Sequence, residues 1–512
     1  MKNAIGREIP EEVVWYDEVI NYSSPFSKEP VGRKIAPLLK QVKPSESKVV
    51  DSLEELIKKV GLKDGMTISF HHHFRNGDYI LNNVVDTIAQ MGIKDITIAP
   101  SSLSTIHEPL VEHMKNGVIT GIHTSGVRGR LAEEISNGLM EKPIVIRSHG
   151  GRARAIEGGE IKIDVAFLGA PSCDSYGNAR GKGENTICGS LGYAKVDAAY
   201  ADQVVMITDD LVPYPNFPAS ISQTEVDYVI KVESVGDPKG IASGATRFTK
   251  NPKELLIAKY ASKFIVNSPY FKDGFSFQTG SGGSSLAVTR FLKEEMRDRN
   301  IKARFALGGI TKPMVEMYEE GLIEKLFDVQ SFDLVACESI IKNPNHHEID
   351  ASFYANPHNK GCIANQLDIV ILSALEIDTN FHVNVITGSD GVIRGASGGH
   401  SDTAAASKLS IIVAPLIRGR IPTVVDRVNT VITPGETVDI LVTDRGIAIN
   451  PKRKDLVEAF ENTDLPIFTI EELKEKAEKI VGKGKPIEYL ERIVGIVEYR
   501  DGSIIDVIKQ VK

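Results

Sequence analysis

Short runs of apolar residues alternate along the chain with charged amphipathic stretches. Residues 96–99, 165–168, 204–207, 369–372 and 411–413 are almost uninterrupted apolar runs, and polar or glycine residues lie close to their ends. Such runs are typical of parallel strands whose two faces are both covered by helices. Residues 82–91 and 285–297 have the pattern of the intervening helices. The chain is therefore predicted to be an α/β protein.

The same pattern occurs twice. Residues 164–174 match residues 368–378 at an offset of 204, 197–207 match 402–412 at 205, and 65–70 resemble 274–279 at 209. Three similar blocks in one order predict two tandem homologous open-sheet domains. We expect an arm at 1–50, a first domain at 51–245, and a second at 246–512 that ends in a helix and hairpin tail. The alternative is two generic α/β segments that share only a strand pattern.

Composition narrows the class of protein. The 512 residues contain 60 Lys and Arg against 68 Asp and Glu, a net charge of −8, and 42% are hydrophobic. These values argue against long disorder and against nucleic acid as the main partner. The four cysteines form no Cys-x-x-Cys pair, so neither a disulfide framework nor a zinc site is expected. No secretory signal or uncharged 18-residue apolar run is visible, which favours a cytoplasmic protein without a membrane segment.

Two glycine-rich loops each follow a predicted strand and open a predicted helix. Neither is a G-x-G-x-x-G or a P-loop motif, which disfavours a dinucleotide-dependent dehydrogenase or an NTPase. Glycine lets backbone N–H groups approach a thioester or a phosphate closely, although a tight strand-to-helix turn explains the same residues. The candidates for thioester or pantetheine binding are Gly280, Ser281, Gly282, Gly283, Gly398 and Gly399.

Histidine and arginine gather after several predicted strands in both halves. Arginine binds carboxylates through paired hydrogen bonds, so these loops predict a polycarboxylate or phosphate ligand. Three consecutive histidines at 71–73 cannot all face one way, so no metal site is expected there. Taken singly, these residues are equally well explained as surface polar groups. The candidates for substrate binding are His71, His72, Arg75, Ser148, His149, Gly150, Arg152, Arg394 and His400.

The order of these motifs resembles the CoA-transferase superfamily, which has NagB/RpiA-like domains, and within it the alpha subunits of citrate lyase. The resemblance rests on residues 164–178, 375–384, 395–402, 431–435 and 438–443. It implies an enzyme that exchanges the acetyl group of a carrier thioester for citrate and releases acetate. It also implies a carrier (gamma) subunit with a CoA-like prosthetic group and a lyase (beta) subunit, in the cytoplasm. No permanently bound cofactor is expected.

The resemblance leaves the nucleophile open. Many members of the superfamily form a glutamyl thioester, and Glu316 occupies the matching position in this sequence. The citrate lyase branch implies instead that citrate attacks the thioester directly in a ternary complex. Two other functions also remain open. One is a covalent carboxylate CoA-transferase for acetate or citramalate, and the other is a binding protein of this fold without catalytic activity.

Overall fold

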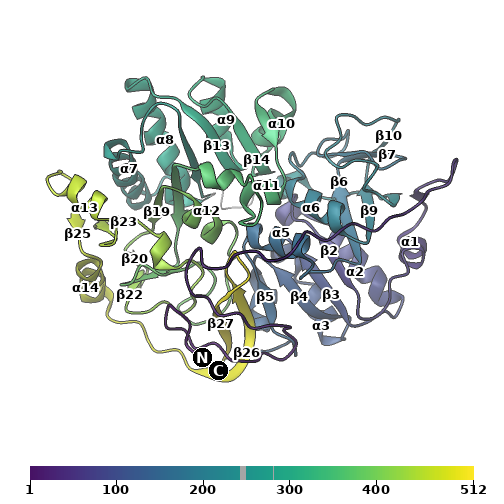
Figure 1. The fold of residues 1–512 in the computed structure, drawn as a ribbon, viewed down its shortest axis with the longest axis horizontal. Coiled ribbons are helices and arrows are strands. Elements are labelled where there is room, and N and C mark those ends of the chain that lie inside the picture. The colour runs from purple at the N-terminus through teal and green to yellow at the C-terminus, as the bar shows by residue number, and fades with distance from the viewer. Residues whose placement is uncertain (243–248, 281) are drawn as a thin grey trace.

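Two largely parallel sheets form the body of the molecule. The computed structural model describes residues 1–242, 249–280 and 282–512 (Figure 1). The first sheet has the order β1-β11-β9-β6-β2-β3-β4-β5-β26-β27. Its strands are β1 (Val49–Val50), β2 (Thr67–Phe70), β3 (Ile96–Pro100), β4 (Ile119–Thr124), β5 (Ile144–Ile146), β6 (Val165–Ala170), β9 (Gln203–Thr208), β11 (Tyr228–Lys231), β26 (Tyr489–Glu498) and β27 (Ile504–Val511).

The second sheet has the order β15-β14-β13-β12-β16-β19-β23-β24-β25. Its strands are β12 (Phe275–Thr279), β13 (Ala303–Ile310), β14 (Leu326–Ser331), β15 (His346–Glu348), β16 (Ile369–Ser373), β19 (Leu409–Val413), β23 (Ile440–Thr443), β24 (Gly446–Ile449) and β25 (Ile467–Phe468). Smaller sheets join β7 (Ser172–Asp174), β8 (Ala179–Arg180) and β10 (Leu211–Val212), then β17 (Glu376–Asp378), β18 (Val383–Asn384) and β22 (Val424–Val425), and finally β20 (Ile417–Arg418) and β21 (Ile421–Pro422).

The two sheets share one connectivity. The order β11-β9-β6-β2-β3-β4-β5 in the first corresponds to β23-β19-β16-β12-β13-β14-β15 in the second, and the neighbours within each run pair in parallel. Each similar sequence block falls on an equivalent pair, namely β2 with β12, β6 with β16 and β9 with β19. The predicted α/β class with parallel sheets is confirmed. The predicted boundary at 245/246 lies outside the described residues and stays a prediction.

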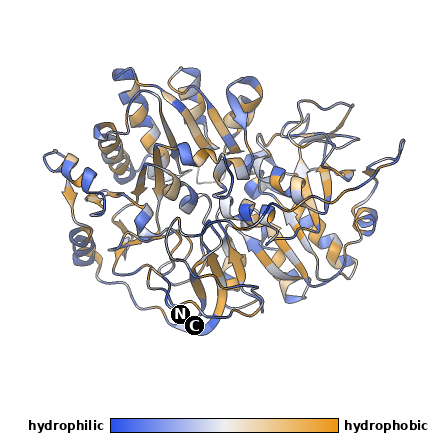
Figure 2. Cartoon of the chain, in the orientation of Figure 1, coloured by the Kyte–Doolittle hydropathy of each residue, from blue (hydrophilic) through white to orange (hydrophobic). Residues whose placement is uncertain are grey.

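Helices cover both faces of the sheets, which explains why the central strands β6 and β12 are buried along their whole length (Figure 2). The predicted helices at 82–91 and 285–297 correspond to α2 and α8. In the first half the helices are α1 (Leu53–Lys59), α2 (Ile80–Gln90), α3 (Leu110–Lys115), α4 (Gly129–Ser136), α5 (His149–Gly158) and α6 (Gly192–Tyr200). In the second half they are α7 (Pro252–Asn267), α8 (Gly283–Asp298), α9 (Lys312–Glu319), α10 (Leu334–Lys342), α11 (Ala351–Ala355), α12 (His400–Ala406), α13 (Lys454–Phe460) and α14 (Ile470–Val481).

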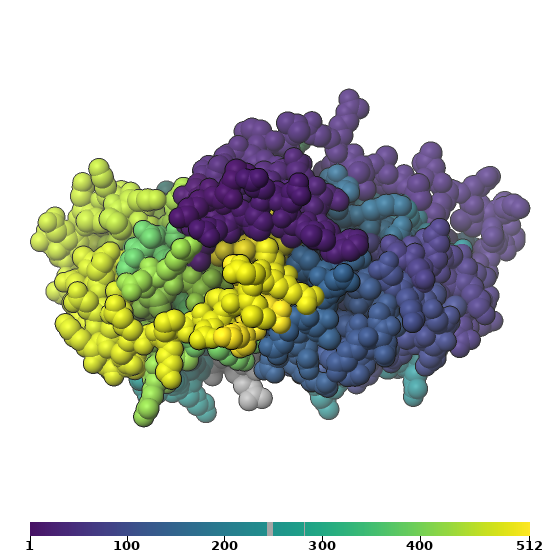
Figure 3. Space-filling view, turned by 90° about the horizontal axis from the view of Figure 1, so that it is seen from below, coloured from purple at the N-terminus to yellow at the C-terminus, as the bar shows by residue number. Residues whose placement is uncertain are grey.

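The C-terminal hairpin returns to the first half of the chain. The sequence placed it in the tail of the second domain, whereas β26 pairs in parallel with β5, with Gly495 opposite Ile144. The edge of β5 would otherwise leave its backbone groups unpaired, and the hairpin covers it. The N-terminal arm lies on this hairpin (Figure 3), where the Tyr22 amide donates to the carbonyl of Ile504 at 3.1 Å. Both ends of the chain therefore meet at one place.

Two negative observations concern the described residues. None of their helices combines the length and apolar character that crossing a bilayer requires. The four cysteines are buried and form no disulfide with one another.

Candidate active site

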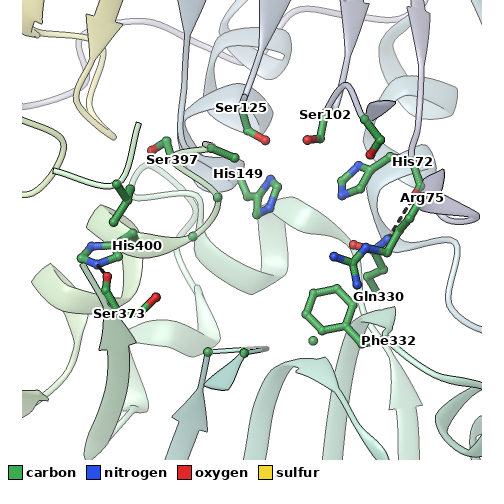
Figure 4. Close-up of a pocket in the computed structure, with 18 of the residues that line it drawn as sticks. His72, Arg75, Ser102, Ser125, His149, Gln330, Phe332, Ser373, Ser397 and His400 are labelled. Carbon is green, nitrogen blue, oxygen red and sulfur yellow. Dashed lines mark hydrogen bonds between the residues drawn. The ribbon is translucent and has the colours of Figure 1, made fainter. Parts of the chain in front are cut away.

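A cavity of about 530 Å³ lies between the two halves (Figure 4). The carboxyl ends of strands from both sheets point toward it, which is where ligands bind in open α/β sheets. From the first half come Ser102 after β3, Ser125 after β4 and His149 at the start of α5. From the second half come Gln330 near the end of β14 and Ser373 at the end of β16. Neither half alone forms this cavity.

The structure brings together only part of the residue set that the sequence predicts. The predicted residues that line the cavity are His72, Arg75, His149, Gly280, Gly282, Gly398, Gly399 and His400. Those that do not line it are His71, Ser148, Gly150, Arg152, Gly283, Glu316 and Arg394. Ser281 lies outside the described residues.

Two arginines give the cavity its positive charge. Arg75 begins a 3-10 turn after β2, and its Nη1 donates to the carbonyl of Ile241 at 3.2 Å. Arg128, the residue before α4, is exposed at the cavity. Burial, followed by the charge of Arg128, lowers the pKa of Arg75 to about 10, so Arg75 remains a cation at neutral pH. Among the described residues, neither arginine forms an ion pair with a carboxylate. The pair therefore suits an anionic ligand.

Neutral rings form one wall of the cavity. The ring of Tyr193 packs against both His72 and His149, with centroid distances of 5.1 and 4.4 Å, and the two imidazoles are 5.9 Å apart. Burial lowers the pKa of His149 to about 3 and that of His72 well below its usual value, so both imidazoles are uncharged at neutral pH. His72 Nδ1 is hydrogen-bonded to Ser101 Oγ, which fixes the plane of its ring. These rings offer neutral hydrogen-bonding groups beside the two arginines.

His400 lines the opposite wall, but both of its ring nitrogens are already bonded. Its Nε2 lies 3.0 Å from the carbonyl oxygen of Ser373 (Figure 4). Its Nδ1 lies 2.7 Å from Thr433 Oγ1. The carbonyl needs a donor, so Nε2 carries the proton and Nδ1 accepts from the threonine. Burial lowers the pKa of His400 to about 4. The ring therefore contributes shape to the cavity and holds α12 against β16.

Three predicted substrate ligands point elsewhere. Arg152 is buried, and its Nη1 and Nη2 donate to the two carboxylate oxygens of Asp197 at 2.7 and 2.8 Å. Arg394 lies on the surface and pairs with Asp390. His71 Nε2 is 2.9 Å from the carbonyl oxygen of Gly169. The sequence pattern correctly placed arginine and histidine after strands. It did not show that Arg152, Arg394 and His71 already bond to other groups of the protein.

Ser148 and Gly150 join the two halves instead of contacting the cavity. Ser148 Oγ donates to Asp402 Oδ1 at 2.7 Å, and the Gly150 amide donates to Asp402 Oδ2 at 2.9 Å. Asp402, on α12, thus caps the N-terminus of α5 in the other half. Its burial raises its pKa to about 6. A side chain at position 150 would clash, because its Cβ would lie 2.0 Å from the carbonyl oxygen of Ala355.

Glu316 does not reach this cavity. It lies on α9, 3.6 Å from Lys312, and lines a separate groove of about 430 Å³ together with Arg290 and Met317. No aspartate or glutamate is among the described residues that line the main cavity, and residues 243–248 and 281 contain no acidic residue. This position disfavours Glu316 as a covalent nucleophile, and that role stays a prediction.

Several lining residues were not found from the sequence. They include Arg128, Ser102, Ser125, Gln330 and Phe332. Each follows or ends a strand in a short polar segment, but single serines and glutamines after strands are too common to single out. The usable signal was their shared position at the carboxyl ends of predicted strands.

Comparisons with known proteins agree over almost the whole chain. The sequence profile of the family "Citrate lyase, alpha subunit (CitF)" matches residues 46–511. The citrate lyase alpha chain of Haemophilus influenzae is 62% identical over 467 residues, which cover 91% of this chain and 93% of the relative. That of Escherichia coli is 60% identical over 470 residues, 92% of each chain.

Solved structures show the same fold. A crystal structure of the alpha subunit of citrate lyase from Streptococcus mutans, in complex with citrate, superposes with a TM-score of 0.97 at 60% identity over 100% of both chains. A Pseudomonas malonate decarboxylase hetero-tetramer in complex with malonate matches with a TM-score of 0.64 at 16% identity, over 81% of this chain and 82% of that one. The second likeness concerns the fold alone. The chain therefore belongs to the family of citrate lyase alpha subunits, the citrate CoA-transferase component of citrate lyase.

Proposed function

We propose that this chain replaces the acetyl group on the thioester of an acyl carrier protein with citrate, giving a citryl thioester and acetate. The observation that carries the proposal is the pair Arg75 and Arg128, two cations that face the cavity without a carboxylate partner among the described residues. The citrate bound to the Streptococcus mutans relative supports a tricarboxylate as the ligand. Free CoA thioesters serve as substitutes for the carrier.

Each group in the cavity has a role in this proposal. Arg75 and Arg128 bind carboxylates of citrate, because a guanidinium matches a carboxylate with two parallel hydrogen bonds. His72 and His149 are neutral and form hydrogen bonds to the substrate without adding charge. Ser102 and Ser125 supply further hydroxyl donors at the ends of β3 and β4. The thioester enters from the side of Gly280, Gly282, Gly398 and Gly399, which line the second half of the cavity.

Among the described residues no aspartate or glutamate lines the cavity, which favours direct attack by citrate. A citrate carboxylate oxygen adds to the acetyl carbonyl carbon, the C–S bond breaks, and the sulfur leaves as a thiolate. The resulting acetyl–citryl anhydride is attacked by the thiolate at the citryl carbonyl, and acetate leaves with the bridging oxygen. Backbone amides of the Gly398–Gly399 turn suit the oxyanion formed in each addition. Gly399 must be glycine, because a Cβ would lie 2.4 Å from Tyr354 Oη.

Partners and location follow from the same proposal. The carrier subunit brings the acetyl thioester on its prosthetic group, so this chain needs no cofactor of its own. A lyase subunit then cleaves the citryl thioester and restores the acetyl form. Membership of the citrate lyase family supports this assembly, and we place it in the cytoplasm.

The purified chain with citrate and acetyl-CoA tests this function. We expect acetate and citryl-CoA to form in equal amounts. NMR measures the acetate and mass spectrometry measures the citryl-CoA. Arg75→Ala and Arg128→Ala are expected to reduce the rate, and the exposed Arg394→Ala is the matched control. Acetate release that does not depend on citrate, or no release with any acid, would remove the proposal.

A further inference from the structure

The second half of the chain holds the loop that carries Arg75. This loop follows β2 in the first half, whereas its partners come from the end of β14 in the second. Gln330 Nε2 donates to the carbonyl of His72 at 2.9 Å, and both residues are buried. The Arg75 guanidinium lies over the ring of Phe332, 5.0 Å from its centroid (Figure 4). The cavity's most buried cation is thus supported from across the interface between the halves.

Phe332 is itself held in one place. Its amide donates to the carbonyl of Ile310 at 2.9 Å, and its ring packs directly on Gly309. A Cβ at position 309 would lie 2.2 Å from Phe332 Cε2, so only glycine leaves room for the ring. Arg75 has a backbone φ of 54°, in the left-handed region that arginine rarely adopts, so this turn depends on the contacts that surround it.

We propose that Phe332, supported by Gly309, is a positioning residue for substrate binding. Its ring holds the plane of the Arg75 guanidinium so that the remaining N–H groups face the carboxylate of citrate. Arg75 makes one hydrogen bond, to the carbonyl of Ile241. Among the described residues no carboxylate pairs with its guanidinium, and the face of the Phe332 ring stabilises this cation instead. The inference rests on the proposed role of Arg75 in binding citrate. It adds a residue that acts on binding through the arginine.

Two substitutions at position 332 separate the ring's electrostatics from its bulk. Phe332→Leu removes the aromatic face and keeps an apolar side chain. Replacement by 3,5-difluorophenylalanine keeps nearly the same size and withdraws electron density from the face of the ring. Phe327→Leu is the matched control, since Phe327 lies on β14, the strand that Phe332 follows, and packs on Phe305 and Phe353 instead of lining the cavity. Circular dichroism checks that each variant is folded.

The citrate KM is the decisive readout. Phe332→Leu is expected to raise it roughly 3- to 30-fold, the range for loss of a partly desolvated cation–π contact. The difluoro variant is expected to fall between wild type and Phe332→Leu, with kcat and the acetyl-CoA KM within about twofold of wild type. An unchanged citrate KM in Phe332→Leu, or a difluoro variant equal to wild type, would overturn the inference. A wild-type chain without citrate-dependent turnover would count against the proposed function itself.

Discussion

At the scale of single residues, the partners of each arginine decide whether its charge is available to a ligand in the cavity. Arg75 and Arg152 both follow a strand end in a loop that is rich in histidine and glycine, so the sequence treats them alike. The structure separates them. The guanidinium of Arg152 forms an ion pair with Asp197. Arg75 faces the cavity with no carboxylate partner in the described part of the chain.

Arg75→Ala tests the first of these roles. Because the lost contact is a charge-assisted hydrogen bond, we expect kcat/KM for citrate to fall by about 1–3 kcal/mol, or roughly 5- to 150-fold. The melting temperature should stay close to that of wild type. Steady-state kinetics with citrate and acetyl-CoA provide the measurement, with Arg394→Ala as a surface control. Citrate kinetics equal to wild type would take Arg75 out of the site.

Arg152→Ala is expected to act on stability instead. The substitution leaves the carboxylate of Asp197 buried and unpaired, which costs about 3–5 kcal/mol in the free energy of unfolding. Urea denaturation measures this loss. The double substitution Arg152→Met with Asp197→Leu should recover much of it, since no lone buried charge remains. A folded, stable Arg152→Ala chain with a raised citrate KM would reverse the assignment.

Glu316→Ala is expected to leave turnover within about twofold of wild type, the size of effect usual for a surface substitution. Glu316 pairs only with Lys312 on α9 and lines the separate groove, not the cavity. Incubation with acetyl-CoA followed by hydroxylamine should therefore leave Glu316 unmodified by mass spectrometry. A hydroxamate at Glu316 would restore the covalent route.

At the scale of elements, the two halves are held together through the ends of helices. Asp402 at the start of α12 accepts hydrogen bonds from Ser148 and Gly150 at the start of α5, and the His149 amide donates to the carbonyl of Gly398 at 2.9 Å. These contacts place His149 and the Gly398–Gly399 turn on adjoining walls of the cavity. Arg500 from the hairpin lies 3.7 Å from Asp402, so the C-terminal tail supports the same junction.

The pKa of Asp402 makes this junction sensitive to pH. Burial raises its pKa to about 6, whereas an unfolded aspartate has a pKa of about 3.9. The native state therefore binds the proton more tightly, and this group's favourable contribution to stability is complete below pH ~4 and lost as pH rises through ~6. Over that interval wild type should lose roughly 3 kcal/mol relative to Asp402→Asn, which does not titrate. Denaturation at several pH values measures the free energy of unfolding of both proteins. A stability of wild type relative to Asp402→Asn that stays constant or increases from pH 4 to pH 6 would contradict the prediction.

The sequence predicts elements better than their partners. Apolar runs located β3, β6, β9, β16 and β19, because a strand buried on both faces is marked by its own residues. The hairpin itself was also predicted, yet its place on β5 was not, since pairing depends on an edge more than 340 residues away. The site follows the same rule. The sequence located the loops that contain His and Arg. It did not reveal the hydrogen-bond partners of Arg152, Ser148 and His400, which come from distant segments of the chain.

At the scale of the whole molecule, a repeated sheet places two sets of strand ends around one cavity. The first half supplies the two arginines and the imidazoles of His72 and His149, and the second supplies His400, the glycine turns and the aromatic support of Arg75. No acidic side chain from the described residues lines this cavity. Because no such acid is present among these residues, we assign the nucleophile to citrate and not to the protein.

A single-turnover reaction with citrate labelled by ¹⁸O in its carboxylates tests this claim most directly. The purified chain, preincubated with acetyl-CoA, is mixed with the labelled citrate and quenched within one turnover. Direct attack passes the bridging oxygen of the anhydride to acetate, so the first acetate released should carry one ¹⁸O by mass spectrometry. Unlabelled acetate in the first turnover, or acetate released before citrate is added, would show that a group of the protein is the nucleophile.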